Sequence, residues 1–262
     1  MSHILRGRLC GYICDECSEP LVRVQVRLYR LRGDQDATTL AVAAPKETFG
    51  VVDEEGRKAK EGHLLVDATT DEDGRFTAEF PDGYDGGPVE VDVFMEEPPH
   101  EGGIDRGELQ FTITTLQPRW RQAGDDLVAV WDYCLPARFW CWVLGWWGLR
   151  VICGRVTVCE TKAPVGGVKV AAFDADWIED DPLGDAVTDG SGRFRIYYSS
   201  AEYERTPLSP WINWEWVHGP DIYFRVVEPS TSAPLLVEPR SRARQPDREN
   251  VGHCFCVELC LE

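Results

Sequence analysis

The composition of the chain indicates a folded, acidic protein. Its 262 residues are 43% hydrophobic and include ten Trp, ten Phe and eight Tyr, enough apolar material for one large core or two ordinary ones. The formal net charge of -18 opposes approach to phosphate backbones and anionic lipid head groups, so we expect no nucleic-acid partner. The most apolar window, residues 139–149, is far shorter than the roughly 20 residues of a membrane-spanning helix, so no transmembrane segment is expected.

Short segments with a strand-like pattern recur along the chain. Hydrophobic and polar residues alternate over residues 22–31, 89–95, 109–116 and 127–133, and strand-like runs continue over residues 149–159, 168–174, 193–199 and 221–228. Almost no window shows the period of an amphipathic helix of useful length, and Gly and Pro occur at strand-sized intervals. The sequence therefore predicts an all-β fold, arranged as a sandwich or barrel.

One seven-residue pattern occurs twice, as Thr-Asp-Glu-Asp-Gly-Arg-Phe at residues 70–76 and as Thr-Asp-Gly-Ser-Gly-Arg-Phe at residues 188–194. In each half a Gly, a Pro and a Val-x-Val precede it, and a Pro that opens a strand follows it, in the same order. Extra residues near 33–62 of the first half are typical of a surface insertion. We predict one sandwich over residues 1–137, a Trp-rich junction over 138–150 and a second sandwich over 151–262.

Both copies of the pattern predict a hairpin turn. The Thr ends a strand, the Asp accepts hydrogen bonds from backbone N–H groups, the Gly supplies a positive φ and the Phe re-enters the core. A calcium loop is less favoured, because the second copy has Gly190 and Ser191 where the first has Glu72 and Asp73. The predicted turn residues are Thr70, Asp71, Gly74, Phe76, Thr188, Asp189, Gly192 and Phe194.

The order of these landmarks points to a known domain family. The second half has Gly-x-Val at residues 154–156, Pro-Val-x-Gly-Val-x-Val at 164–170, the turn at 188–194 and Pro-Asp-Ile-Tyr-Phe at 220–224. In this order it resembles the carboxypeptidase regulatory-like domain of the transthyretin (prealbumin-like) superfamily, and the first half resembles it more loosely. The resemblance implies two tandem Greek-key β-sandwiches of transthyretin-like or immunoglobulin-like type. Since the motif residues are structural, they indicate a fold and not an activity.

The ten cysteines gather near the two ends of each half. Disulfides, a zinc site and buried reduced thiols are all compatible with this distribution. The N-terminal sequence has no apolar core of signal-peptide length, so we expect a cytoplasmic or particle-associated protein in a reducing compartment, where free thiols are favoured. The metal content stays open, because four ligands from Cys14-x-x-Cys17 and Cys254-x-Cys256 would not have a recognised zinc-ribbon spacing.

Two aromatic clusters and an acidic segment are the remaining candidates for interaction. The first cluster, Trp140, Trp142, Trp146 and Trp147, is expected to form a core between the sandwiches, which we favour over an exposed partner-binding patch. Trp211, Trp214 and Trp216 precede a strand, where they either cover an open sandwich end or form a platform for sugars or proteins. The acidic residues of segment 174–186 lack EF-hand spacing, which favours a solvated loop over a calcium site.

These features favour a non-enzymatic structural or interaction protein that serves as a docking or scaffold subunit of a larger assembly. We expect protein partners, a homo- or hetero-oligomeric state and no cofactor, with partner binding through Trp211, Trp214, Trp216 and exposed sheet edges. No residue is predicted to be catalytic, and no Gly-x-Ser-x-Gly nucleophile elbow occurs. Two alternatives stay open: a carbohydrate- or calcium-dependent adhesion module, and a metal-dependent enzyme that uses the thiols or histidines.

Overall fold

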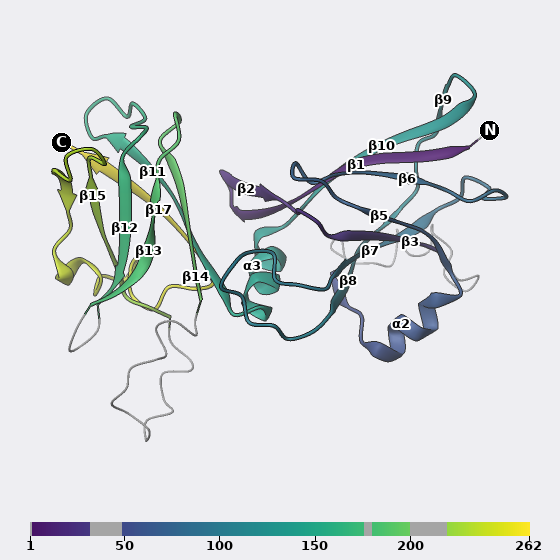
Figure 1. The fold of residues 1–262 in the computed structure, drawn as a ribbon, viewed down its shortest axis with the longest axis horizontal. Coiled ribbons are helices and arrows are strands. Elements are labelled where there is room, and N and C mark those ends of the chain that lie inside the picture. The colour runs from purple at the N-terminus through teal and green to yellow at the C-terminus, as the bar shows by residue number, and fades with distance from the viewer. Residues whose placement is uncertain (1, 32–48, 176–179, 200–218) are drawn as a thin grey trace. The chain divides into compact units, whose positions relative to one another are not determined.

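The computed structural model of the chain describes residues 2–31, 49–175, 180–199 and 219–262 (Figure 1). Strands dominate these residues and form four sheets, which confirms the predicted all-β sandwich fold. The chain divides into two compact units, each assembled from several segments. Unit 1 comprises Met1–Tyr12, Ser18–Pro99 and Asp105–Phe139, and unit 2 comprises Ile13–Cys17, His100–Ile104 and Trp140–Glu262.

The strands before the second half form two sheets. One has the order β2-β1-β10-β9, with β6 also paired to β1, and the other has the order β4-β8-β7-β3-β5. The first strand, β1, is parallel to β10 and antiparallel to β6. The strands are β1 (His3–Cys14), β2 (Cys17–Pro20), β3 (Gln25–Arg30), β4 (Gly50–Val51), β5 (Leu64–Thr69), β6 (Arg75–Glu79), β7 (Val89–Met95), β8 (Leu109–Leu116), β9 (Arg121–Ala123) and β10 (Asp126–Leu135).

Unit 2 also has two sheets, with the orders β14-β11-β17 and β13-β12-β15-β16. Its first strand, β11, is parallel to β17 and antiparallel to β14. A short 3-10 helix, Arg240–Arg242, follows β16. The strands are β11 (Leu149–Val158), β12 (Lys169–Asp174), β13 (Asp181–Val187), β14 (Arg193–Ser199), β15 (Ile222–Val227), β16 (Pro234–Val237) and β17 (Cys254–Leu261).

The two units share one strand order. The run β6-β1-β10 corresponds to β14-β11-β17, and the run β5-β3-β7-β8 corresponds to β13-β12-β15-β16. The register corresponds as well, because Gly7 is the partner of Phe76 on the neighbouring strand and Gly154 is the partner of Phe194. The Gly and Phe landmarks of the two halves therefore occupy equivalent places in the two units.

The core of unit 2 shows why the alternating pattern folds in this way. Val170 and Ala172 on β12 are fully buried and the alternating residues of the strand are only partly buried, so every second side chain enters the core. Phe224 and Val226 on β15 and Ile196 on β14 pack in the same cluster. Burial of each large apolar side chain contributes roughly 1.5–3 kcal/mol, which makes this interior the main source of stability of the unit.

Two α-helices in the described part of the chain were not expected from the sequence. The helix α2 (Glu54–Glu61) lies in the predicted insertion, of which residues 33–48 are outside the described part, and buries none of its residues. Its first turn is acidic, its last turn is basic, and Asp53 caps it by accepting a hydrogen bond from the Gly56 N–H at 2.8 Å. The helix α3 (Ala137–Trp146) is too short and apolar all round to show a clear polar face, although Trp140, Val143 and Leu144 form a buried stripe. Neither helix has the length and hydrophobicity that a bilayer crossing requires, nor does any other helix among the described residues.

We expect Gly154→Ala to destabilise unit 2 by roughly 1–3 kcal/mol, because an added methyl group overpacks a filled core. A Cβ at this position would overlap the Phe194 ring and would lie 2.9 Å from Val257 Cγ1. Gly190→Ala is the matched control, since no atom lies within 4 Å of its added Cβ. Urea unfolding followed by Trp fluorescence measures the free energy of unfolding. Equal losses in the two variants would contradict the packing argument.

Candidate functional site

The second copy of the repeated turn uses its acidic side chain to hold the backbone. Oδ1 of Asp189 accepts hydrogen bonds from the backbone N–H groups of Ser191 at 2.8 Å and Arg193 at 3.0 Å. A hydrogen bond from the Ser191 hydroxyl and these N–H groups lower the pKa of the Asp189 carboxyl. Gly192 has a φ of 77°, the left-handed conformation that glycine adopts without strain. The carboxylate is thus engaged within the turn.

The first copy of the turn has the same geometry. Oδ1 of Asp71 accepts hydrogen bonds from the N–H groups of Asp73 at 2.9 Å and Arg75 at 2.7 Å, and Gly74 has a φ of 75°. In both turns the Thr hydroxyl accepts a hydrogen bond from the Val that precedes the paired strand, and the Phe is buried. The hydrogen-bonded pairs are Thr70 with Val24 and Thr188 with Val168, and the buried aromatic residues are Phe76 and Phe194.

Part of the acidic segment near residues 174–186 is also engaged within the fold. Asp174 is buried and accepts a hydrogen bond from the Asp221 N–H at 2.8 Å. Asp180 accepts one from the Tyr223 hydroxyl at 2.7 Å. Asp185 forms an ion pair of 3.1 Å with Lys169. These contacts favour a structural role for the three carboxylates, whereas Asp176 and Glu179 lie outside the described residues.

The structure describes one of the two predicted tryptophan clusters. Trp211, Trp214 and Trp216 lie outside the described residues, so the docking platform stays a prediction. In the other cluster Trp140 and Trp147 are buried, but Trp142 is 40% exposed. Trp140 and Trp147 therefore belong to an interior, whereas the role of these residues as a core between the sandwiches stays a prediction.

All ten cysteines form disulfides, so the preference for free thiols was wrong. That preference rested on the N-terminal sequence, which carries no information about how strands bring thiols together. The parallel first and last strands place Cys10 opposite Cys134 and Cys153 opposite Cys256. The pairs are Cys10–Cys134, Cys14–Cys256, Cys17–Cys153, Cys141–Cys254 and Cys159–Cys260, with Cα–Cα distances between 4.3 and 6.7 Å.

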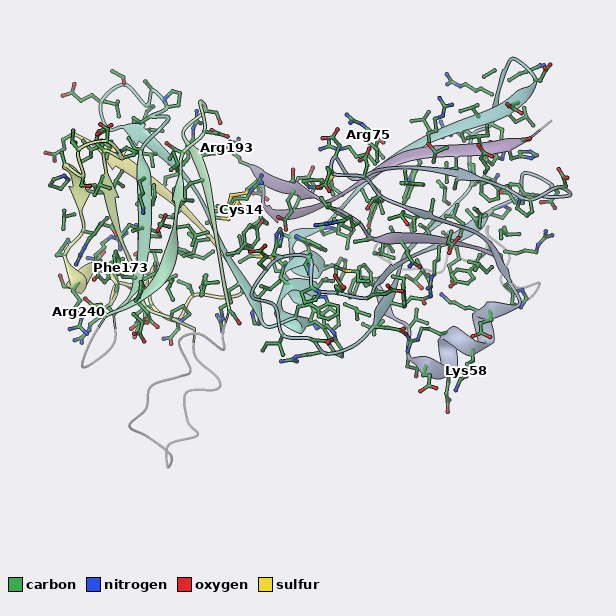
Figure 2. The ribbon with its side chains drawn as sticks, viewed as in Figure 1. Cys14, Lys58, Arg75, Phe173, Arg193 and Arg240 are labelled. Atoms are coloured by element: carbon green, nitrogen blue, oxygen red, sulfur yellow. A yellow bond between two sulfur atoms is a disulfide. The ribbon has the colours of Figure 1, made fainter. Side chains whose placement is uncertain are left out.

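Two of these disulfides lie side by side in unit 2 and form what we call the four-cysteine cluster, made of Cys14, Cys17, Cys153 and Cys256 (Figure 2). Cys14 and Cys17 flank a two-residue turn between β1 and β2. Cys153 and Cys256 are register partners on β11 and β17. The sulfur atoms of Cys14, Cys17 and Cys153 all lie within 4.8 Å of one another, so sulfurs of two different disulfides are close neighbours.

An open cavity of about 330 Å³ adjoins the four-cysteine cluster. Its lining includes two basic residues, Arg155 and Arg193, and three acidic residues, Asp15, Glu16 and Glu258. Arg193 donates to the backbone carbonyl of Glu16 and pairs with its carboxylate at 3.9 Å. The cavity therefore combines soft sulfur atoms with both signs of charge.

Unit 1 contains a buried polar cluster centred on Lys60 of α2. Its Nζ lies 2.6 Å from Glu90 Oε1 and 2.8 Å from Asp92 Oδ2, and it donates to the Thr112 hydroxyl at 2.9 Å. Asp92 is fully buried on β7 and also accepts a hydrogen bond from Gln110 at 2.7 Å.

The charges of this cluster keep the amine protonated. Burial alone would lower the pKa of Lys60, but the carboxylates of Asp92 and Glu90 outweigh burial and raise it. A protonated amine in ion pairs is a poor nucleophile, so the arrangement favours a structural role over covalent catalysis. The only sequence signal was a pair of acidic residues, Glu90 and Asp92, at alternate positions of an otherwise apolar strand.

Comparisons with known proteins give only distant similarities. No family model matches the chain, and no curated protein matches it. Among solved structures, the minor pilin GBS52 of Streptococcus agalactiae is 14% identical over 100% of this chain and 95% of its own, with a TM-score of 0.29. The shaft pilin SpaA from Lactobacillus rhamnosus GG is 12% identical over 100% of this chain and 97% of its own, with a TM-score of 0.25. A 9R-lipoxygenase from Cyanothece PCC8801 is 21% identical over 43% of this chain but only 16% of its own, with a TM-score of 0.29. TM-scores this low assign no function to the chain.

Proposed function

We propose that the protein is a non-enzymatic structural subunit of a larger assembly, built to carry tension without extending. It would consist of two tandem transthyretin-like sandwiches of the carboxypeptidase regulatory-like type. The shared order of seven strands and the matching Gly–Phe registers of the two units support this duplication. The pairing of all ten cysteines supports the tension-carrying role.

The observation on which this role depends is the disulfide between Cys14 and Cys256, which are separated by 242 positions in the sequence. It joins β1, the first strand of the chain, to β17, the last. A pull on the two chain ends passes along β1, across this bond and out along β17. The residues between the two cysteines then bear none of the force.

Further disulfides would preserve this behaviour if that bond were absent. Cys10–Cys134 joins β1 to β10, and Cys159–Cys260 joins the end of β11 to β17. Each of these bonds links the parallel first and last strands of one unit. Since the strands of such a pair slide past each other when pulled from opposite ends, all of their ladder hydrogen bonds share the force.

The disulfides also favour an oxidising setting. Stable disulfides persist outside the reducing cytoplasm, for instance in secreted proteins and on the surfaces of particles. We therefore propose that, of the cytoplasmic and particle-associated settings expected from the sequence, the subunit occupies the surface of a particle, exposed to an oxidising medium. Its partners would be protein subunits that contact exposed sheet edges and the segment containing Trp211, Trp214 and Trp216.

Single-molecule pulling on the chain ends tests the tension-carrying role. We expect the oxidised protein to show no unfolding event that releases a long segment. After reduction, unfolding should release chain length on the order of 80 nm in total, because the hidden residues extend by about 3.3–3.6 Å each. The oxidised and reduced samples of one protein are matched in sequence, so the disulfides are the only difference. Equal release from both samples would overturn the proposal.

A further inference from the structure

Beyond its structural role, we propose that the four-cysteine cluster is a Zn²⁺ site in the reduced protein. The disulfide form and the zinc form would be alternative states of the same four side chains. Reduction by a dithiol reductant delivers two electrons to each of the two disulfides and yields four thiols. Binding of one Zn²⁺ to the four sulfurs then releases four protons, because zinc takes cysteine as the thiolate.

The backbone presents the four sulfurs in two pairs. Cys14 and Cys17 are three residues apart across a turn, a spacing that zinc sites commonly use. Cys153 and Cys256 are register partners on adjacent parallel strands. Each residue of the turn pair is bonded to one residue of the strand pair, so the two pairs face each other. This is the arrangement that four tetrahedral ligands need.

The distances between the sulfur atoms fit one small cation. Zinc bound by four thiolates at about 2.3 Å places neighbouring sulfurs about 3.8 Å apart. The sulfurs of Cys14, Cys17 and Cys153 already lie within 4.8 Å of one another, and the sulfur of Cys256 is bonded to that of Cys14. Reduction would therefore leave three thiols close together, and the thiol of Cys256, whose sulfur lies outside this group, would shift to complete the four ligands.

The surroundings also suit a zinc–thiolate centre, whose formal charge is −2. The Nε of Arg195 donates to the sulfur of Cys17 at 3.5 Å, and such hydrogen bonds orient and stabilise a thiolate ligand. Arg155 and Arg193 line the adjoining cavity and offset negative charge, while the carboxylates that line it are exposed. The cavity gives the ion a path of entry.

The first test measures zinc binding by the full chain. The protein is reduced without oxygen, freed of reductant and given Zn²⁺, and bound zinc is quantified after removal of excess metal. We expect one zinc per chain and, with Co²⁺ as a probe, the intense visible bands of a tetrahedral thiolate site. No retained zinc would overturn the proposal. A Co²⁺ spectrum without thiolate-to-metal charge transfer would overturn it as well.

The second test identifies the ligands. Cys153→Ser/Cys256→Ser should lose the zinc, whereas Cys159→Ser/Cys260→Ser, which removes a disulfide from the same two strands, should keep it. Alkylation of the wild-type protein with zinc bound gives the answer even if a variant fails to fold. Mass spectrometry should find Cys14, Cys17, Cys153 and Cys256 protected and the other six cysteines modified. Protection of a different set would contradict the assignment.

Discussion

Lys60→Met is expected to destabilise unit 1 by about 3–5 kcal/mol, the usual cost of removing one partner from a buried ion pair. The Lys60 side chain is 14% exposed and that of Asp92 is fully buried, so solvent cannot replace the lost ammonium group. Methionine keeps most of the length of the side chain, which limits the loss of packing. The buried carboxyl group of Asp92 would then lose its ammonium partner and keep the hydrogen bond from Gln110.

Lys58→Met on the same helix is the matched control. Lys58 pairs with Glu54 at 2.6 Å, but both side chains are more than 65% exposed, at 67% and 71%. An exposed pair of this kind contributes only about 0.3–0.5 kcal/mol. Urea unfolding of the two variants gives the comparison. If both lost the same stability, helix propensity would be responsible and not the buried charge.

The pH dependence of stability gives an independent readout of the same cluster. The pKa of Lys60 is raised in the folded protein, so the native state binds the proton more tightly than the unfolded chain does. The stabilisation is therefore complete below the unfolded pKa of about 10.4 and is lost as the pH rises through the folded value. We expect the free energy of unfolding of Lys60→Met to fall less than that of the wild type as the pH rises above about 10. An equal loss of stability in the two proteins at alkaline pH would contradict a stabilising role for the Lys60 ion pairs.

The sequence predicted the fold class well because the fold depends on local patterns. The alternation in β12 that predicts a strand is the same alternation that buries Val170 and Ala172. By contrast, most residues of α3 are apolar, so its sequence shows no alternation of apolar and polar residues with the helical period. The buried stripe of Trp140, Val143 and Leu144 is therefore not recognisable from the sequence. Helix α2 was hidden for the opposite reason, since it has no apolar stripe and is favoured by its cap, its charges and the ion pairs of Lys60 with distant strand residues.

The candidate sites depend on contacts between distant residues, which one sequence does not reveal. Lys60 and Asp92 are 32 positions apart, and Cys14 and Cys256 are 242 apart. Ten cysteines permit a very large number of pairings, and the sequence does not show that Cys10 lies opposite Cys134. Nor does it show that Cys153 and Cys256, register partners on β11 and β17, are each bonded to a cysteine beside the β1–β2 turn. Clustering of the cysteines near the ends of each half was visible in the sequence, but their oxidation state was not.

Removal of the Cys10–Cys134 disulfide, as Cys10→Ser/Cys134→Ser, is expected to destabilise unit 1 by about 3 kcal/mol. The two residues are 124 positions apart, and a loop of that length taken alone would give about 4.7 kcal/mol in the chain-entropy model. The other disulfides shorten the effective loop, however. Cys14–Cys256 and Cys141–Cys254 attach both β1 and the segment after β10 to β17. In the unfolded chain, Cys10 and Cys134 are therefore already joined through a loop of roughly 16 residues.

Calorimetry of the oxidised proteins measures this effect, and reduction supplies the control. The variant should unfold at a lower temperature than the wild type under oxidising conditions, and the two should coincide after reduction, when neither has cross-links. A difference that persists after reduction would mean that the serines disturb the native packing of Cys10, which is buried. A loss near 4.7 kcal/mol would show that the other cross-links do not constrain the unfolded chain, which would contradict the proposal that they carry tension together.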